Sequence, residues 1–295
     1  MNSETQKSPV LVAALWMLGM VFSLSTIAIS ARELSAQMGP FQMIFFRCIF
    51  GLLALTPIVL YQYGQIPLSK KFGNHIARNM SHYGGQVFWF FGISYLSLAE
   101  VFAIEFTTPM WTLLLAYFIL GEKITRWRAV SLVFGLIGMM LILRPGLENI
   151  HFASFLVIVS AFCFALSHIF TRKLAQIESP TMILFYMGLV QAPIAIIPAL
   201  FNWVTPEGLA WMWLLFMGIA SITAHYCLSR ALALADASIM IPIDFLRLPM
   251  IMLVGYVFYG EDIDVFIVLG ASIMFAGNFL NVRNEHKHQQ NDVGH

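Results

Sequence analysis

The sequence predicts an all-α membrane protein with ten transmembrane helices, arranged as two inverted five-helix repeats. Three observations predict this fold class. Hydrophobic residues make up 59% of the 295-residue chain and charged residues only 11%, whereas soluble domains carry about 25% charged residues. Apolar runs of about 20 residues, long enough to cross a bilayer, recur ten times along the chain. The two halves of the chain also share a sequence motif.

The predicted spans begin and end at glycines, prolines and charge clusters. The first follows Lys7 and is longer than the apolar core of a signal peptide, and Arg32 and Glu33 come after it, so we interpret it as a helix of the mature protein. The fourth is the least apolar because it contains Glu100 and Glu105, and it forms a tight hairpin with the third. The spans cover residues 9–30, 41–63, 79–97, 99–120, 127–144, 152–171, 180–201, 209–228, 237–259 and 264–282.

Ten spans place both chain ends on one side of the membrane, and the distribution of basic residues selects the side. Twelve of the sixteen lysines and arginines lie in segments that are cytoplasmic if the N-terminus is inside, and two lie in outer loops. The remaining two, Arg47 and Arg247, lie within spans. We therefore expect both termini in the cytoplasm. The polar residues 283–295 are predicted to form a disordered cytoplasmic tail.

The shared motif lies at residues 105–122 (EFTTPMWTLLLAYFILGE) and 244–261 (DFLRLPMIMLVGYVFYGE), and both copies start with an acid and a phenylalanine and end in Gly-Glu. It divides the chain into repeats at 9–144 and 152–282, each with five spans. Because five is odd, the second repeat must enter the membrane upside down. Inverted repeats are typical of secondary transporters, although a duplicated scaffold that transports nothing is an alternative.

Three segments carry a resemblance to a known family: FFRCIFGLL at 45–53, FTTPMWTLLLAYFILGE at 106–122 and DASIMIPIDFLRLPMIMLVGYVFYGE at 236–261. On these segments the chain resembles the drug/metabolite transporter superfamily, in its EamA-like group of ten-span carriers, from about residue 9 to 282. The resemblance implies a carrier of the cell inner membrane with a central cavity lined mainly by spans 1, 3, 4, 6, 8 and 9. The chain looks most like the branch that includes carriers of riboflavin and S-adenosylmethionine.

Charged residues inside spans need a partner or a hydrated cavity, since each costs about 3 kcal/mol or more near the bilayer centre. Asp244 and Arg247 lie three residues apart in the ninth span, so they share a helix face and can pair. Glu105 and Arg47 lie at similar depths near the outer ends of their spans and form a second predicted pair. We interpret both pairs as substrate-binding or gating groups, with static helix-to-helix locks as the alternative.

Three prolines lie beside these charges. Pro109, Pro242 and Pro249 each lack the N–H that would bond to the carbonyl four residues back. Pro109 in this way frees the carbonyl of Glu105. A helix broken beside a charged residue is one way to build a polar site within a membrane. A packing kink is the alternative interpretation.

Histidines and aromatic residues complete the candidate site. His82, His168 and His225 lie near the cytoplasmic ends of spans 3, 6 and 8, where a histidine can bind a substrate anion or relay a proton. A hydrogen-bonded interfacial histidine is the alternative. Aromatic rings on the expected cavity helices offer flat faces to a planar ligand, unless they face lipid. Those predicted to bind substrate are Trp89, Trp111, Tyr226 and Phe245.

The motifs that the chain lacks narrow the function further. There is no Gly-x4-Gly-Lys-Ser/Thr phosphate loop and no histidine or cysteine spacing typical of a metal site. We therefore expect no ATP hydrolysis, no cofactor, no bound metal and no enzymatic activity. Transport is expected to be downhill or coupled to an ion gradient, with Glu105 as the candidate proton carrier.

The predicted function is alternating-access transport of a small organic metabolite. Uptake of riboflavin, or of a similar planar or nucleoside-like compound, is the first prediction for the substrate. Export of amino acids or amino-acid-derived metabolites is the alternative, and a channel or scaffold is the non-transporter alternative. The expected partners are the substrate and the lipid bilayer, with a homodimer left open. A net charge of +1 gives no reason to expect nucleic acid.

Overall fold

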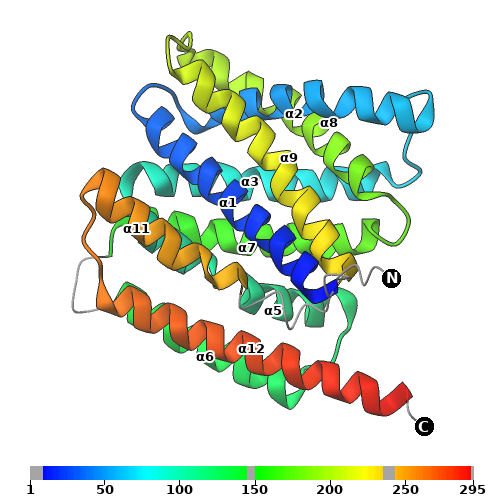
Figure 1. Ribbon diagram of the computed structural model, residues 1–295, viewed down its shortest axis with the longest axis vertical. Coiled ribbons are helices and arrows are strands. Elements are labelled where there is room, and N and C mark those ends of the chain that lie inside the picture. Colours follow the sequence, from blue (N-terminus) through cyan, green and yellow to red (C-terminus); the bar gives the residue numbers. More distant parts are fainter. Residues whose placement is uncertain (1–8, 145–149, 235–242, 294–295) are drawn as a thin grey trace, which may run out of the picture.

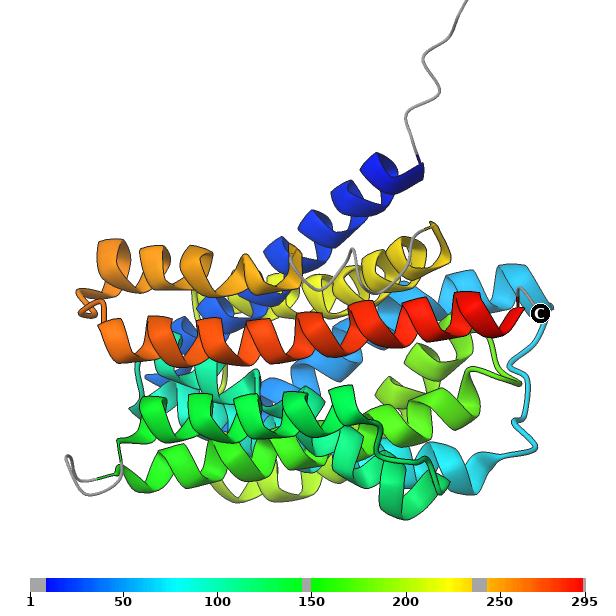
Figure 2. The same ribbon diagram turned by 90° about the horizontal axis from the view of Figure 1, so that it is seen from below.

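Helices form nearly all of the backbone in the computed structural model, which describes residues 9–144, 150–234 and 243–293 and has no strand in those ranges. Figure 1 and Figure 2 show them as a single bundle of long helices. The start of α1 and the end of α12 lie toward the same end of the bundle (Figure 1).

The first half of the chain contains six helices and the second half contains the rest. The first set is α1 (Pro9–Ser35), α2 (Pro40–Tyr63), α3 (Phe72–Tyr95), α4 (Leu98–Glu105), α5 (Thr108–Leu120) and α6 (Arg126–Leu143). The second set is α7 (Phe152–Leu174), α8 (Pro180–Ala199), the 3-10 turn η1 (Leu200–Asn202), α9 (Ala210–Leu234), α11 (Arg247–Tyr259) and α12 (Val265–Val293).

Local sequence explains where several of these helices start and stop. The side chains of Ser97, Thr125 and Ser179 accept backbone N–H groups in the first turns of α4, α6 and α8, as N-cap residues do. Gly121 and Gly260 end α5 and α11 in the left-handed conformation, with φ of 68° and 64°. Glycine reaches this region at little cost, so the Gly-Glu ends of the repeated motif are helix stops.

Among the described residues, eight helices are long and apolar enough to cross a membrane: Leu11–Ser35, Pro40–Tyr63, Leu98–Leu120, Arg126–Leu143, Phe152–Leu174, Pro180–Asn202, Ala210–Leu234 and Val265–Asn284. Two predicted spans are missing from this set. The span predicted at 79–97 lies in α3, which carries many polar residues along one face. The span predicted at 237–259 begins outside the described residues and continues as α11. The ten-span count therefore stays a prediction.

The helices of the two halves pack on each other in a regular pattern. The first helix of each half packs on the third helix of the other half, as α1 with α9 and α7 with α3. The second helices pair with each other as α2 with α8, and the last as α6 with α12. The repeated motifs also meet, because α4 packs on α11. Two units related by a pseudo-twofold axis produce this pattern of partners.

Glycines bring α6 and α12 into backbone contact. A Cβ atom added at Gly138 would lie 2.5 Å from the carbonyl oxygen of Gly270, and one added at Gly270 would lie 2.6 Å from that of Gly138. A Cβ atom added at Gly135 would lie 3.0 Å from the Met110 sulfur, and one added at Gly277 would lie 2.5 Å from Phe134 Cβ. Small residues allow this close approach of apolar helices in a membrane.

The C-terminal end differs from the prediction. The segment 283–295 was expected to be a disordered tail, but α12 continues as a helix through Val293. The stretch from Asn281 to Val293 contains no glycine or proline that would stop a helix. Its polar composition therefore does not end the helix that starts within the membrane.

Candidate functional site

The two copies of the repeated motif meet in the interior, where α4 ends and α11 begins. Phe106 and Phe245, which occupy equivalent positions in the motif, stack with ring centroids 4.2 Å apart and planes 11° from parallel. The residue before each ring is an acid, Glu105 in one copy and Asp244 in the other. The halves therefore present matching aromatic and acidic groups to each other.

Arg247 joins these acids. Its Nη1 lies 3.1 Å from Glu105 Oε1, and its Nε lies 3.7 Å from Asp244 Oδ1, so the predicted pair of Asp244 with Arg247 is present. The Arg247 guanidinium also lies 5.0 Å from the ring centre of Phe106. Only 7% of the Arg247 side chain is exposed. We call Trp89, Glu105, Phe106, Asp244, Phe245 and Arg247 the central group.

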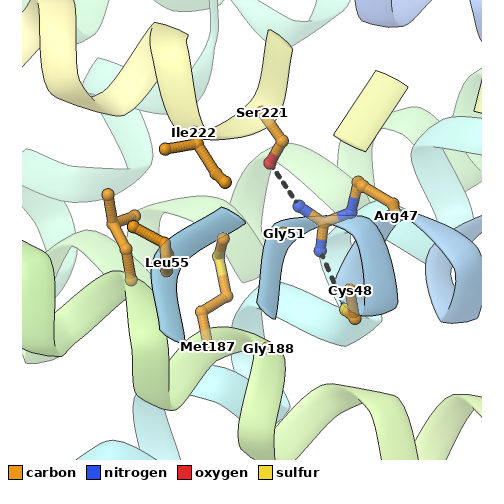
Figure 3. Close-up of a pocket in the computed structure, with 9 residues that line it drawn as sticks. Arg47, Cys48, Gly51, Leu55, Met187, Gly188, Ser221 and Ile222 are labelled. Atoms are coloured by element: carbon orange, nitrogen blue, oxygen red, sulfur yellow. Dashed lines mark hydrogen bonds between the residues drawn. The ribbon is translucent and has the colours of Figure 1, made fainter. Parts of the chain in front are cut away.

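Glu105 has a different partner from the one predicted. Besides Arg247, its Oε2 accepts a hydrogen bond of 2.8 Å from Trp89 Nε1. The expected partner, Arg47, instead donates to Ser221 Oγ at 2.7 Å and to Gln86 Oε1 and Gln191 Oε1, each at 2.8 Å (Figure 3 shows the Ser221 bond). The prediction of a Glu105–Arg47 pair is wrong because α2 packs mainly on α8 and α9, whereas α4 packs mainly on α7 and α11.

The helix is interrupted between α4 and α5, directly after Glu105, as Pro109 suggests. Pro109 cannot donate to the Glu105 carbonyl, and the hydroxyl of Thr108 donates to that oxygen at 2.6 Å. The hydroxyl of Thr107 likewise donates to the carbonyl of Ile104 at 2.7 Å. The freed carbonyls are thus satisfied within the chain. In the second half, Pro249 lies in the first turn of α11, and Pro242 lies outside the described residues.

A polar stripe runs along α3 from the central group toward the α2–α3 connection. It includes Trp89 and His82, which the sequence singled out, and Arg78, Asn79 and Gln86, which it did not. All five are buried, and their spacing of three, four or seven residues places them on one helix face. That spacing is the signal that could have identified the missed residues. Gln191 on α8, also buried, carried no such signal.

The three predicted histidines lie at the other end of this stripe. The rings of His82 and His225 have centroids 6.2 Å apart, and the Gln191 amide nitrogen lies 3.1 Å from His82 Nδ1. His168 shares a face of α7 with the fully buried Ala161 and Ala165, yet its own side chain is exposed. Within the described ranges, no group of three His, Cys, Asp or Glu residues could hold a metal ion.

Two of the predicted aromatic residues lie outside the central group. Trp111 packs edge-on against Phe162 of α7, with ring centroids 5.8 Å apart. Tyr226 is half exposed and packs against Trp16 of α1 at 5.7 Å. Tyr226 thus lies at the surface of the bundle rather than among the interior polar groups.

The Gly-Glu ends of the two motifs form ion pairs at opposite ends of the bundle, because the α5–α6 and α11–α12 connections lie at opposite ends (Figure 1). Glu122 pairs with Arg128, at 2.8 Å, and with Arg172. Glu261 pairs with Arg32 at 2.9 Å and accepts the backbone N–H of Leu98 at 2.8 Å. We call these the Glu122 clamp and the Glu261 clamp.

The two clamp carboxyl groups have opposite pKa shifts. Burial raises the pKa of Glu261 above its ordinary value of 4.5, and the attraction of Arg32 and the hydrogen bond from Leu98 only partly offset this. Burial also acts on Glu122, but hydrogen bonds from Arg128 and Arg172 outweigh it and leave the pKa below 4.5. The clamps are therefore related in sequence but differ electrostatically.

Membrane-length apolar helices that bury charged and aromatic groups between two similar halves are typical of helical membrane transporters. The chain belongs to the EamA-like transporter family, whose domain matches residues 11–144 and 151–283. It is therefore a small-molecule transporter and not an enzyme, and the family resemblance found in the sequence is confirmed.

Relatives of this chain are named for two substrates. The S-adenosylmethionine uptake transporter of Rickettsia prowazekii (strain Madrid E) is 28% identical over 274 residues, which cover 92% of each chain. The riboflavin transporter of Rhizobium johnstonii is 28% identical over 291 residues, covering 97% of this chain and 95% of the relative. A protein of known crystal structure shares the fold with a TM-score of 0.66, at 15% identity over 91% of this chain and 94% of that chain.

Proposed function

We propose that this protein is a secondary transporter of the cell inner membrane that moves a small organic metabolite by alternating access. Ten spans in two inverted five-helix halves enclose the pathway, with both termini in the cytoplasm. The observation that carries the proposal is the central group, where equivalent residues of the two halves meet. In secondary transporters built from inverted repeats, the substrate site lies between the repeats and next to broken helices.

The polar stripe supports counting α3 as one of the ten proposed spans, although hydropathy alone does not identify α3 as a membrane helix. Its residues are buried against the rest of the bundle, so the helix can cross the membrane with its polar face turned inward. The excess of basic residues in the segments expected inside supports cytoplasmic termini.

The inverted arrangement has a direct test at the two clamps. Glu122→Cys and Glu261→Cys, each in a background without the three native cysteines, are labelled with a membrane-impermeant thiol reagent in intact cells and in inside-out vesicles. We expect Glu261→Cys to react from outside and Glu122→Cys from inside. Reaction of both from the same side would contradict two inverted halves.

The Glu105–Arg247 contact crosses between the two halves, so it must change when the halves move against each other. It joins a residue of the first motif to a residue of the second across α4 and α11. Rocking of one half would stretch this contact, and Asp244, three residues before Arg247, would keep the guanidinium paired. We infer that the pair exchanges partners during the transport cycle.

For the substrate we propose a planar, ring-bearing metabolite, with riboflavin or a nucleoside-like compound such as S-adenosylmethionine taken up into the cell. The stacked rings of Phe106 and Phe245 provide flat apolar faces. The Trp89 ring provides another, and its hydrogen bond to Glu105 holds it near Phe106. The substrate names of two relatives support the same chemical class. Export of an amino-acid-derived metabolite is the alternative for direction.

Uptake by the purified protein in proteoliposomes tests this function. Radiolabelled riboflavin, S-adenosylmethionine and amino acids are compared, and we expect saturable uptake of one of the first two. This uptake should be lost in Arg247→Ala and Asp244→Asn and kept in Arg126→Gln, which changes an exposed arginine. Amino-acid efflux without uptake of either ring compound would overturn the substrate proposal, and no transport of any of them would contradict the function.

A further inference from the structure

Two buried arginines have only neutral partners. Arg47 is 2% exposed, and its hydrogen bonds go to Gln86, Gln191, Ser221 and the Cys48 thiol. Arg78 is 3% exposed, and its hydrogen bonds go to Asn79 Oδ1 at 2.7 Å and to a threonine hydroxyl on α7. Among the described residues, neither guanidinium has a carboxylate within ion-pair distance.

Other arginines in the described ranges show what these two lack. An aspartate or glutamate pairs with each of Arg32, Arg128, Arg144, Arg172 and Arg247. Most of those arginines lie near the ends of the bundle, where water also screens charge. Arg47 and Arg78 are more deeply buried, yet their hydrogen bonds go to amides, hydroxyls and a thiol rather than to carboxylates.

Amide side chains link the two arginines into one cluster. The Gln191 amide oxygen accepts a hydrogen bond from Arg47. The Gln191 amide nitrogen donates to the backbone carbonyl of Asn79 at 3.2 Å and to His82 Nδ1 at 3.1 Å. The Asn79 side chain in turn accepts from Arg78. We call Arg47, Arg78, Asn79, His82, Gln86 and Gln191 the arginine cluster. Its neutral members orient the guanidinium groups but cannot balance their charge.

Arg47 also borders a small pocket. This pocket between α2, α8 and α9 is lined by Arg47 and Ser221, and most of its remaining wall is apolar, including Leu55, Met187 and Ile222 (Figure 3). The Nε atom of Arg47 is buried and has no hydrogen-bond partner. The guanidinium thus has an unused donor and a neighbouring cavity.

A buried charge is stable only with a partner or bound water. The planar guanidinium group presents parallel N–H donors that match the two oxygens of a carboxylate or phosphate. We propose that the arginine cluster binds an oxyanion, the carboxylate or phosphate of the transported metabolite, as a subsite separate from the central group. This rests on the proposed transport function and, among its substrates, favours a ring-bearing metabolite with an acidic group, such as S-adenosylmethionine, over riboflavin, which has none.

Pairs of compounds that differ only in the anion test the subsite. Riboflavin 5′-phosphate is compared with riboflavin, and S-adenosylmethionine with its decarboxylated form, by ligand-induced thermal stabilisation of the purified protein. We expect the member with the oxyanion to bind about tenfold more tightly or better in at least one pair, as a charged hydrogen bond contributes. Arg47→Gln and Arg78→Gln should each bring that ratio close to one.

The matched control is Arg126→Gln, which removes an exposed arginine and should keep the ratio. If the cluster were purely structural, Arg47→Gln and Arg78→Gln would lower the stability of the protein, but the native protein would show no preference for the anion. Arg47→Lys keeps the charge but loses the planar fork, so it should retain part of the ratio if Arg47→Gln does not fold. Equal affinities within both pairs, or a ratio that persists in both arginine variants, would overturn the proposal.

A further arm does not depend on which metabolite is carried. Inorganic phosphate should stabilise the native protein against thermal unfolding and should have no such effect on Arg47→Gln. Transport of riboflavin without any preference for phosphate-bearing compounds would leave the proposed function in place and overturn the anion subsite. Phosphate binding without uptake of either ring compound would leave the anion subsite in place and overturn the substrate proposal.

Discussion

Removing Arg247 should destabilise the protein far more than neutralising Glu105. Arg247→Leu leaves Glu105, which is 16% exposed, with only the Trp89 N–H as a partner for its charge. Breaking a buried ion pair in this way costs about 3–5 kcal/mol. Glu105→Gln keeps an acceptor for Trp89, and Arg247 still has Asp244 at 3.7 Å, so we expect a cost of about 1–2 kcal/mol.

A double-mutant cycle measures this coupling. Glu105→Gln, Arg247→Leu and the double variant are purified in one detergent, and thermal unfolding is followed by the reactivity of buried cysteines. In the double variant no unpaired charge remains on Glu105, so it should be more stable than Arg247→Leu alone, with a coupling of about 1–3 kcal/mol. A coupling below about 0.5 kcal/mol, or an equal loss in Arg126→Leu, would refute the reasoning.

Two other consequences can be measured in the same way. Gly138→Ala should separate α6 from α12, because the added Cβ would lie 2.5 Å from the carbonyl oxygen of Gly270, whereas ordinary contacts are 3.4 Å or more. We expect it to lower the stability by about 1–3 kcal/mol in a thermal unfolding assay. Gly73→Ala is the control, because an added Cβ there has no heavy atom within 4 Å and should cost nothing. The clamps should respond to pH in opposite directions. The lowered pKa of Glu122 makes its stabilising contribution complete above pH 4.5 and lost as the pH falls through that pKa, so Glu122→Gln should be the less stable protein only at higher pH. The raised pKa of Glu261 makes its contribution complete below pH 4.5 and lost as the pH rises through that pKa, so Glu261→Gln should gain stability relative to the native protein over that range. Parallel pH profiles for the two variants would contradict the assigned causes.

The sequence predicts those parts of the site that depend on local spacing. Asp244 and Arg247 are only three residues apart, so their side chains stay within 3.7 Å although a turn at Leu246 separates Asp244 from α11. Pro109 marks the break after Glu105 for the same local reason, since the missing N–H is a property of one residue.

Partners on different helices are not visible in this way. Glu105 and Arg47 lie at similar depths along their spans, but similar depth does not make two spans neighbours. The true neighbours follow from the pairing of the two halves, in which α2 packs on α8 and brings Gln191 to Arg47. A buried glutamine at the centre of an apolar run has no sequence signal that separates it from an isolated polar residue.

The interleaved packing of the halves has a consequence for how the chain is made. The main partners of α1, α3 and α6 are α9, α7 and α12, all encoded in the second half. When the ribosome has delivered only the first half of the chain, the polar face of α3 lacks the partners that it has on α7 and α8, such as Thr171 and Gln191. Neither half can therefore complete its helix pairs without the other.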